Sequence, residues 1–173
     1  MDYKEYTVKV SDNGTKYWFL NGELHREDGP AVELPDGTKR WYLNGELHRE
    51  DGPAVEYPDG YKAWYLNDEL HREDGPTIVY SNGTKYWYLN GKKHREDGPA
   101  VVASNGDKYW YLDGKKHRED GPAVEFPDGT KFWYLNNEYL TEEEFNKRMS
   151  PASCDGKIVE IDGKKYRLVE EVE

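Results

Sequence analysis

The strongest constraint on this chain is an internal repeat of 23 residues. All tryptophans and all histidines follow it, at Trp18, Trp41, Trp64, Trp87, Trp110 and Trp133 and at His25, His48, His71, His94 and His117. A fixed period of this length is typical of repeat architectures, in which each unit packs mainly against its neighbours. The sequence therefore predicts a stacked array of units and not a thick globular core.

One unit, TKRWYLNGELHREDGPAVEYPDG, contains two strand-like segments and two turns. The side chains of residues 39–43 alternate in the pattern of a strand and are rich in aromatic rings. Residues 54–57 form a second short strand-like segment. Asn44-Gly45 favours a tight turn, since both residues tolerate positive φ. Residues 48–53, HREDGP, form a polar connector that ends in a Gly-Pro breaker. Each unit is therefore expected to supply two short antiparallel strands, with no room for a helix.

Strand alternation sorts the side chains into two faces. Lys39, Trp41 and Leu43 share one face, while Arg40 and Tyr42 share the other. We expect the Trp, Leu and Val columns to pack together on one face of the sheet. The column of tyrosines would then follow the opposite face.

The fold class predicted from this pattern is all-β, an elongated single-layer antiparallel sheet of two-strand repeats. Neighbouring strands lie about 4.8 Å apart, so each unit would add about 9.6 Å. The array is expected over residues 1–140, a short helix over 141–149, and a linker with a β-hairpin over 150–173. Thr141 and Glu144 fit a capping box for the helix, and Asp162-Gly163 fits the turn of the hairpin. Whether this tail caps the array or forms an appended module stays open.

The unit resembles the MORN repeat in its spacing of an aromatic residue, glycines and Asp-Gly. Trp41, Gly45, His48, Gly52 and Asp59-Gly60 match that pattern, and the resemblance covers about residues 7–140. The HREDGP connector departs from the usual His-Gly-x-Gly and looks like repeat proteins of phages, large viruses and bacteria. The resemblance implies a single-layer sheet that serves as a scaffold for protein partners. Some bacterial variants are presumed antitoxins, which implies an inhibitory role.

A second resemblance concerns residues 86–91, YWYLNG, which are similar to choline-binding and glucan-binding repeats. Those repeats form aromatic cages for quaternary ammonium groups or sugars. This resemblance implies small-ligand capture as an alternative function.

Charge and composition exclude several classes of protein. The net charge of −11 argues against binding to a phosphate backbone, although an acidic mimic of nucleic acid stays possible. No apolar stretch approaches the roughly 20 residues that span a bilayer, and the first ten residues contain no apolar core of a signal peptide. The single cysteine, Cys154, excludes an intramolecular disulfide and is interpreted as an ordinary thiol. We therefore expect a cytoplasmic protein, in the host cytoplasm if it is encoded by a virus or phage, with no membrane association.

The His-Arg-Glu-Asp motif suggests metal binding, but the spacing argues against it. Equivalent residues about 9.6 Å apart cannot share one ion, because metal–ligand bonds are about 2.0–2.2 Å long. We expect no metal, no cofactor and no enzymatic activity. The arginine is expected to pair with the glutamate or aspartate of its own or a neighbouring connector, and the aspartate to cap the Gly-Pro turn. The Trp and His columns, together with the aspartates, are thus interpreted as structural, the aspartates being Asp28, Asp51, Asp74, Asp97 and Asp120.

The candidate binding surface is an aromatic and acidic stripe on the face opposite the tryptophans. It comprises Tyr42, Tyr65, Tyr88, Tyr111 and Tyr134 with Glu33, Glu56 and Glu125. Tyrosine is enriched at protein interfaces, so a protein partner is the leading hypothesis, with an inhibitor of a host defence factor or toxin as the setting that the resemblance implies. A nucleotide signal, choline or a glycan bound between the aromatic columns is the alternative. Open sheet edges also allow self-association.

Overall fold

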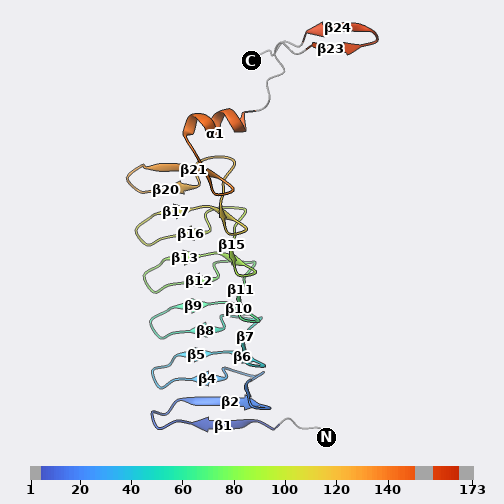
Figure 1. The fold of residues 1–173 in the computed structure, drawn as a ribbon. Helices are drawn as coiled ribbons and strands as arrows, with labels where there is room; N and C mark the ends of the chain where they lie inside the picture. The colour runs from blue at the N-terminus through green and yellow to red at the C-terminus, as the bar shows by residue number, and fades with distance from the viewer. Residues whose placement is uncertain (1–4, 151–157, 168–173) are drawn as a thin grey trace. The chain divides into compact units, whose positions relative to one another are not determined.

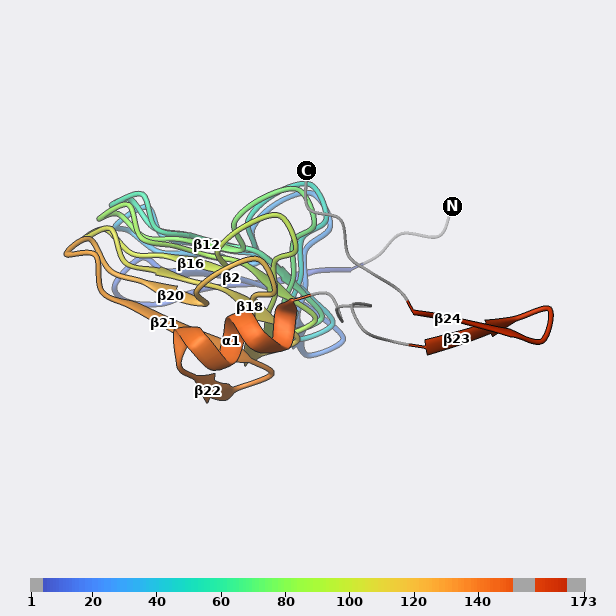
Figure 2. The ribbon, with the colours of Figure 1, turned by 90° about the horizontal axis from the view of Figure 1, so that it is seen from above.

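The computed structural model describes residues 5–150 and 158–167, and the chain divides into two compact parts, Met1–Tyr139 and Leu140–Glu173. The first part is built on a long antiparallel sheet of short strands, which are stacked one above another in chain order (Figure 1). This architecture confirms the predicted fold class. Viewed along the stack, successive units lie almost on top of one another (Figure 2).

The main sheet takes two strands from each unit, and each strand pairs with the preceding and following one. Its order is β1-β2-β4-β5-β8-β9-β12-β13-β16-β17-β20-β21-β22, and β3 pairs with β2 beside this path. These strands are β1 (Thr7–Val10), β2 (Lys16–Leu20), β3 (Glu23–Leu24), β4 (Val32–Glu33), β5 (Lys39–Arg40), β8 (Val55–Glu56), β9 (Lys62–Ala63), β12 (Ile78–Val79), β13 (Lys85–Tyr86), β16 (Val101–Val102), β17 (Lys108–Tyr109), β20 (Val124–Glu125), β21 (Lys131–Leu135) and β22 (Glu138–Leu140).

A second ladder of small hairpins runs beside the main sheet. The hairpins pair β6 (Tyr42–Leu43) with β7 (Glu46–Leu47), β10 (Tyr65–Leu66) with β11 (Glu69–Leu70), β14 (Tyr88–Leu89) with β15 (Lys92–Lys93), and β18 (Tyr111–Leu112) with β19 (Lys115–Lys116). Backbone hydrogen bonds join each hairpin to the next unit: the amide of Arg26 donates to the carbonyl oxygen of Tyr42 at 3.0 Å. The amide of Gly45 likewise donates to the carbonyl oxygen of Leu24 at 2.9 Å.

This second ladder corrects the predicted unit, which had one strand over residues 39–43. The strand is interrupted at Trp41, whose amide donates to the carbonyl oxygen of Ala54 while its own carbonyl accepts from the amide of His48. Trp41 therefore bonds to the main sheet on one side and to the hairpin ladder on the other. The short strand Glu46–Leu47 was not predicted either, because two residues between turn signals carry no visible alternation.

The turns confirm their sequence signals. Asn44 and Gly45 both adopt positive φ, 52° and 82°, as a two-residue hairpin turn requires. At the other end of the unit, the amide of Thr38 donates to the Asp36 carboxylate at 2.8 Å and Gly37 has a φ of 91°. Aspartate and glycine are thus needed by the geometry of this turn.

The core is thin and lies on one face of the main sheet. Val55, Ala63 and Ile78 form a buried cluster, and partly buried residues pack against it: Leu47, Tyr61, Tyr65, Leu70, Tyr86 and Tyr88. The prediction that Val would pack with Trp, opposite the tyrosines, is wrong. Val55 stands opposite Arg40 and Ala63 in the sheet, and Glu56 stands opposite Lys39. This register places valine on the face away from the Lys and Trp columns, together with tyrosine.

The C-terminal part, Leu140–Glu173, contains α1 (Glu142–Met149), β23 (Ile158–Ile161) and β24 (Lys164–Arg167). The predicted capping box is present, since Thr141 and Glu144 bond each other's backbone amides, and Phe145 is buried. The predicted hairpin turn is confirmed by positive φ at Asp162 and Gly163. Cys154 and most of the predicted linker lie outside the described residues. In the part of the chain that the structure describes, no helix has the length and apolar character needed to cross a bilayer.

Candidate functional site

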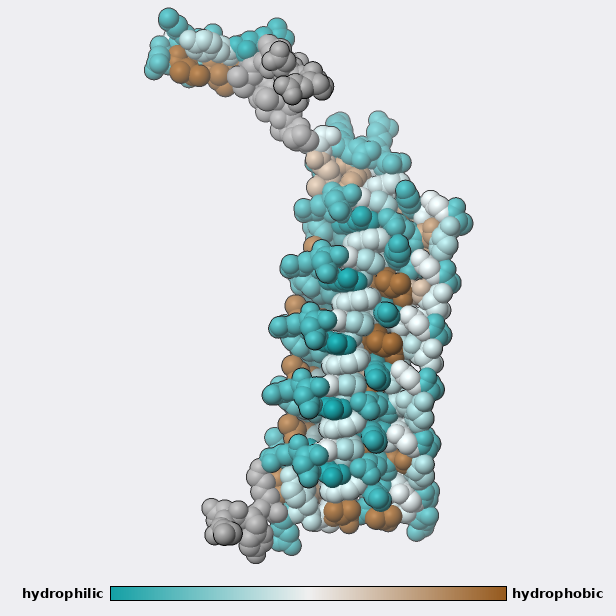
Figure 3. All heavy atoms as spheres, turned by 180° about the vertical axis from the view of Figure 1, so that it is seen from behind, coloured by the Kyte–Doolittle hydropathy of each residue, from teal (hydrophilic) through white to brown (hydrophobic). Residues whose placement is uncertain are grey.

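The pairing register gives the main sheet two different faces. On the first, which we call the tryptophan face, lysine and glutamate stand opposite each other across the strands: Lys16 with Glu33, Glu33 with Lys39 and Lys39 with Glu56. Arg49 joins this ladder to the tryptophans, because it contacts both Glu56 and the ring of Trp41. Figure 3 shows this face, with a regular hydrophilic column beside a paler one.

Each connector on the tryptophan face is built around its arginine. The guanidinium carbon lies 4.1–4.3 Å from the ring centre of the tryptophan eight positions earlier, a cation–π contact found in five units. The Nε atom donates to the aspartate two residues later at 2.7–2.9 Å. Nη1 donates to the carbonyl oxygen of the connector proline at 3.2–3.4 Å. These contacts fix the guanidinium group, and only 21–24 % of each arginine side chain is exposed.

The predicted pairing of arginine within its own connector is therefore confirmed. The aspartate contacts the arginine side chain, and the arginine in turn bonds the carbonyl of the connector proline, as Arg49 does with Asp51 and Pro53. The guanidinium lowers the pKa of each connector aspartate below the usual range, through its hydrogen bond and its charge. The five aspartates are Asp28, Asp51, Asp74, Asp97 and Asp120.

The histidines link each connector to the next unit. His25 Nδ1 accepts a hydrogen bond from the backbone amide of Asn44 at 3.0 Å. The amides of Asn67, Asp113 and Asn136 donate in the same way to Nδ1 of His48, His94 and His117. The Nδ1 atoms of His25, His48 and His94 also lie 2.8–3.0 Å from the side-chain Oδ1 atom of the same partner residue. These hydrogen bonds therefore join neighbouring units of the array. His25 and His117 are buried.

Between successive connectors lie four equivalent grooves of about 640–750 Å³. The groove between connectors 25–30 and 48–53 is lined by Trp41 and Leu43 together with the charged residues of both connectors. The lips carry Glu50 and Asp51, whose side chains are 86 % and 85 % exposed. A related groove at the N-terminal end is lined by Tyr6, Val8 and Trp18 with the first connector. The tryptophan column therefore lines a row of similar recesses.

The middle of the tryptophan face departs from the repeat. Val79 and Val102 occupy the position that is Glu33, Glu56 and Glu125 in the other units. Lys85 consequently has a valine opposite it on both sides. Arg26, Arg49 and Arg118 each reach that glutamate at 2.9–3.3 Å, whereas at Arg72 and Arg95 valine replaces it. In Figure 3, hydrophobic patches interrupt the hydrophilic surface about half-way along the stack.

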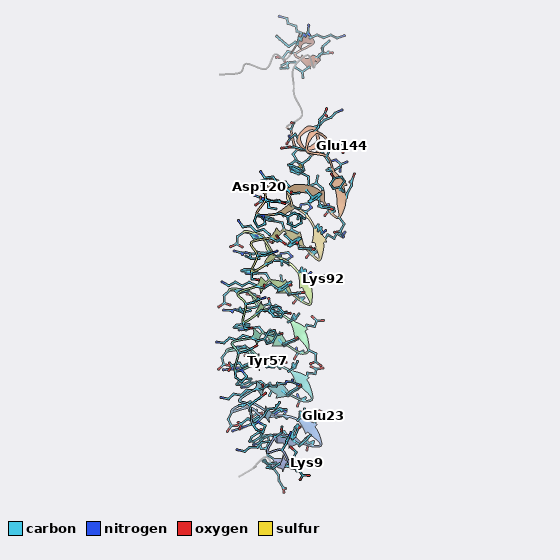
Figure 4. All side chains as sticks on the ribbon, turned by 90° about the vertical axis from the view of Figure 1, so that its left-hand side faces the viewer. Lys9, Glu23, Tyr57, Lys92, Asp120 and Glu144 are labelled. Atoms are coloured by element: carbon cyan, nitrogen blue, oxygen red, sulfur yellow. The ribbon has the colours of Figure 1, made fainter. Side chains whose placement is uncertain are left out.

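The opposite surface, which we call the tyrosine face, carries a continuous run of aromatic rings. The ring centres are 4.9 Å apart for Tyr57 and Tyr61, 5.2 Å for Tyr61 and Tyr80, and 5.7 Å for Tyr80 and Tyr86. We name these four residues the tyrosine cluster. Tyr57, labelled in Figure 4, and Tyr80 are 38 % and 40 % exposed. Burial, reinforced by neighbouring tyrosines, raises the pKa of Tyr61 to about 12.

The structure separates the two halves of the predicted binding stripe. Tyr65 and Tyr88 pack against the buried cluster of Val55, Ala63 and Ile78. The predicted glutamates instead pair with arginines on the tryptophan face, namely Glu33, Glu56 and Glu125. Tyr42 begins hairpin strand β6. Further along the same column, Lys93 and Lys116 lie over the rings of Tyr111 and Tyr134, at 5.1 and 4.8 Å. The predicted tyrosines therefore share one face, and the predicted glutamates belong to the other.

Two features were missed by the sequence reasoning. The arginine column follows each tryptophan by eight residues, a constant offset that was visible but whose stacking depends on how the hairpin folds back. Tyr57, Tyr61 and Tyr80 occupy positions that differ between units, so a comparison of the units with one another would have found them.

Among residues 5–150 and 158–167, no three His, Cys, Asp or Glu side chains converge in a way that could hold a metal ion.

Comparison with known proteins returned no family: no family model matches the chain, and no curated protein matches it.

Proposed function

We propose that this protein is a non-catalytic scaffold that binds a protein partner through the tyrosine cluster. The observation that carries the proposal is the run of neighbouring rings formed by Tyr57, Tyr61, Tyr80 and Tyr86, two of which are well exposed. Tyrosines are large, rigid and able to donate hydrogen bonds, so clusters of them are typical of interface hot spots.

The scaffold itself does not require these rings. Position 57 is Leu34 in the preceding unit, and position 80 is Ala103 in the following one. Position 61 is threonine in four other units. Since all these units adopt the same strands and turns, the exposed tyrosines are additions to a surface that folds without them.

Residues already used elsewhere in the array provide the test. The double variant Tyr57→Ala and Tyr80→Ala places the Ala103 residue type at both positions, so folding is expected to be retained. Affinity capture from the native host with crosslink mapping should recover one partner whose crosslinks fall on the tyrosine face. The variant should lose that partner at least tenfold, because hot-spot truncations commonly cost more than about 2 kcal/mol each.

The matched control is Phe126→Ala, which removes an aromatic ring at the same repeat position two units away. This control should retain the partner. The proposal fails if the double variant captures the same partner as the unmodified protein, or if the crosslinks map away from the cluster.

The resemblance to MORN repeats supports the wider setting of the proposal. It favours a cytoplasmic protein of a phage, virus or bacterium that inhibits a host protein. A tyrosine-dependent partner that proves to be a defence factor or a toxin would support this setting, and loss of that partner's activity on binding would test it.

A further inference from the structure

We propose that the tryptophan face is a second binding surface, which holds a cationic peptide segment in the polyproline II conformation. One basic side chain would enter each of the grooves between successive connectors. This surface lies across the sheet from the tyrosine cluster, so the inference is independent of the proposed function.

The charge of the connectors selects a cation. Five connectors carry ten carboxylates against five guanidiniums. The guanidiniums are largely buried in contacts with their own tryptophan and aspartate. The carboxylates instead form the exposed lips, with Glu50, Glu73 and Glu96 at 84–86 % exposure. A ligand that approaches this surface therefore meets excess negative charge.

The lining of the grooves favours a side chain with an apolar stem and a cationic end. Each groove is lined by a tryptophan and a leucine together with the charged connector residues, as Trp87 and Leu89 line the groove between connectors 71–76 and 94–99. The aliphatic part of arginine or lysine packs against such surface while its charged end reaches carboxylates. The grooves are also large enough for it, at about 640–750 Å³.

The spacing of the grooves selects the conformation of the ligand. Two strands per unit place successive grooves about 9.6 Å apart along the stack. A polyproline II helix has three residues per turn and rises about 3.1 Å per residue, so every third side chain recurs on one face after about 9.3 Å. A β-strand repeats its face after about 6.6 Å, and a heptad of α-helix after about 10.5 Å, so both lose register over four grooves.

Aromatic-lined surfaces also suit this conformation in general. Polyproline II segments are already extended before binding, so they lose little conformational entropy when they dock in such grooves. The periodic tryptophan face would therefore read a periodic ligand, with a basic residue at every third position.

The test uses synthetic peptides and isothermal titration calorimetry with the full chain. A capped peptide of four Pro-Pro-Arg triplets should bind saturably at one peptide per chain. A peptide of the same composition, with eight prolines followed by four arginines, should bind at least tenfold more weakly. Two triplets alone should also bind at least tenfold more weakly than four. Equal affinity of the spaced and block peptides, or no saturable binding of the four-triplet peptide, would overturn the proposal.

Protein variants locate the peptide on the tryptophan face. The triple variant Glu50→Gln, Glu73→Gln and Glu96→Gln should weaken binding about tenfold, since each exposed ion pair contributes about twofold to fivefold. The matched control Glu23→Gln, Glu46→Gln and Glu69→Gln makes the same charge change outside the groove linings and should change affinity less than twofold. An equal loss in both variants would contradict the groove assignment. Loss of peptide binding in the tyrosine-cluster variant would contradict the independence of the two surfaces.

Discussion

The two faces of the repeat sheet differ in how strictly they repeat. On the tryptophan face, the tryptophan and the connector arginine and aspartate recur in five units, with nearly the same distances between them. On the tyrosine face, position 57 and its equivalents are leucine, tyrosine, tyrosine, alanine and phenylalanine. The contrast teaches that the contacts made within each unit on the tryptophan face are constant, whereas the exposed positions of the tyrosine face vary from unit to unit.

Acid is expected to act on every connector at once. Arginine lowers the pKa of the connector aspartates below the ordinary value of 3.8, so the unfolded chain binds more protons than the folded chain in this range. Their contribution is present above about pH 4 and is lost as the pH falls below it. Urea unfolding from pH 6 to pH 2 should show this loss of stability. A variant with asparagine at all five positions should lose less over the same range; an unchanged pH dependence would contradict the role of the pairs.

Among single substitutions, Trp64→Ala should have the largest effect. It removes a half-buried indole and the stacking surface of Arg72, 4.1 Å from its ring centre. We expect a loss of about 3 kcal/mol in the free energy of unfolding. Tyr57→Ala on the opposite face should lose about 1 kcal/mol, since that ring is well exposed. Chemical denaturation of both variants makes the comparison, and a larger loss for Tyr57→Ala would reverse our assignment of the two faces.

Gly52→Ala should disturb the stacking of Arg49 on Trp41 by steric clash, because it adds a methyl group beside the guanidinium. A Cβ atom at this position would lie 2.7 Å from the Arg49 guanidinium carbon, so the side chain must shift from its position over Trp41. Such overpacking costs about 1–3 kcal/mol. At Gly121 the corresponding distance to Arg118 is 3.2 Å, so Gly121→Ala is the milder, matched change. Thermal unfolding should rank the two in this order; equal effects would indicate that the arginine moves without cost.

Thr77→Ala should cost about 1 kcal/mol. The fully buried hydroxyl of Thr77 donates to the carbonyl oxygen of Tyr88 at 2.9 Å and accepts from its amide at 2.8 Å. The other units have alanine at this position, so the substitution introduces a residue type that the fold already accepts. Thr77→Ser keeps the hydroxyl and should restore most of the stability. A serine variant as unstable as the alanine variant would contradict the role of the hydrogen bonds.

The smallest effect is expected where the tryptophan face itself departs from the repeat. Val79→Glu introduces the residue type that pairs with arginine in three other units and places it opposite Lys62 and Lys85. We expect a gain of no more than about 0.5 kcal/mol, the usual value of an exposed ion pair. Glu56→Val makes the reverse change and should lose a similar amount. A loss of stability in Val79→Glu would show that the valines in the middle units are needed for packing.

Local chemistry was predictable from the sequence, and pairing register was not. Asn44-Gly45 and the Thr141–Glu144 capping box each act within a few residues, so their letters suffice to specify the geometry. The face of Val55 depends on whether it pairs with Lys39 or Arg40, and a shift of one residue moves a side chain to the opposite face. No letter within the unit specifies that choice.

The candidate surfaces followed the same rule. The pairing of Arg49 with Asp51 spans two residues and was expected, whereas the stacking of Arg49 on Trp41 depends on the return of the hairpin. The grooves arise only when two units stack, so they have no signature within one unit.

Distances between equivalent positions test the stacking of the units most directly. Glu23, Glu46, Glu69, Lys92 and Lys115 are exposed equivalents, and Glu23 and Lys92 lie along the same edge of the stack in Figure 4. With Cys154 replaced, spin labels at position 23 and at position 69, 92 or 115 allow electron–electron distance measurements. Side-by-side units predict a linear series that grows by about 9.6 Å per unit, so the three distances should be about 19, 29 and 38 Å. Distances that do not increase steadily with the number of units would contradict the account.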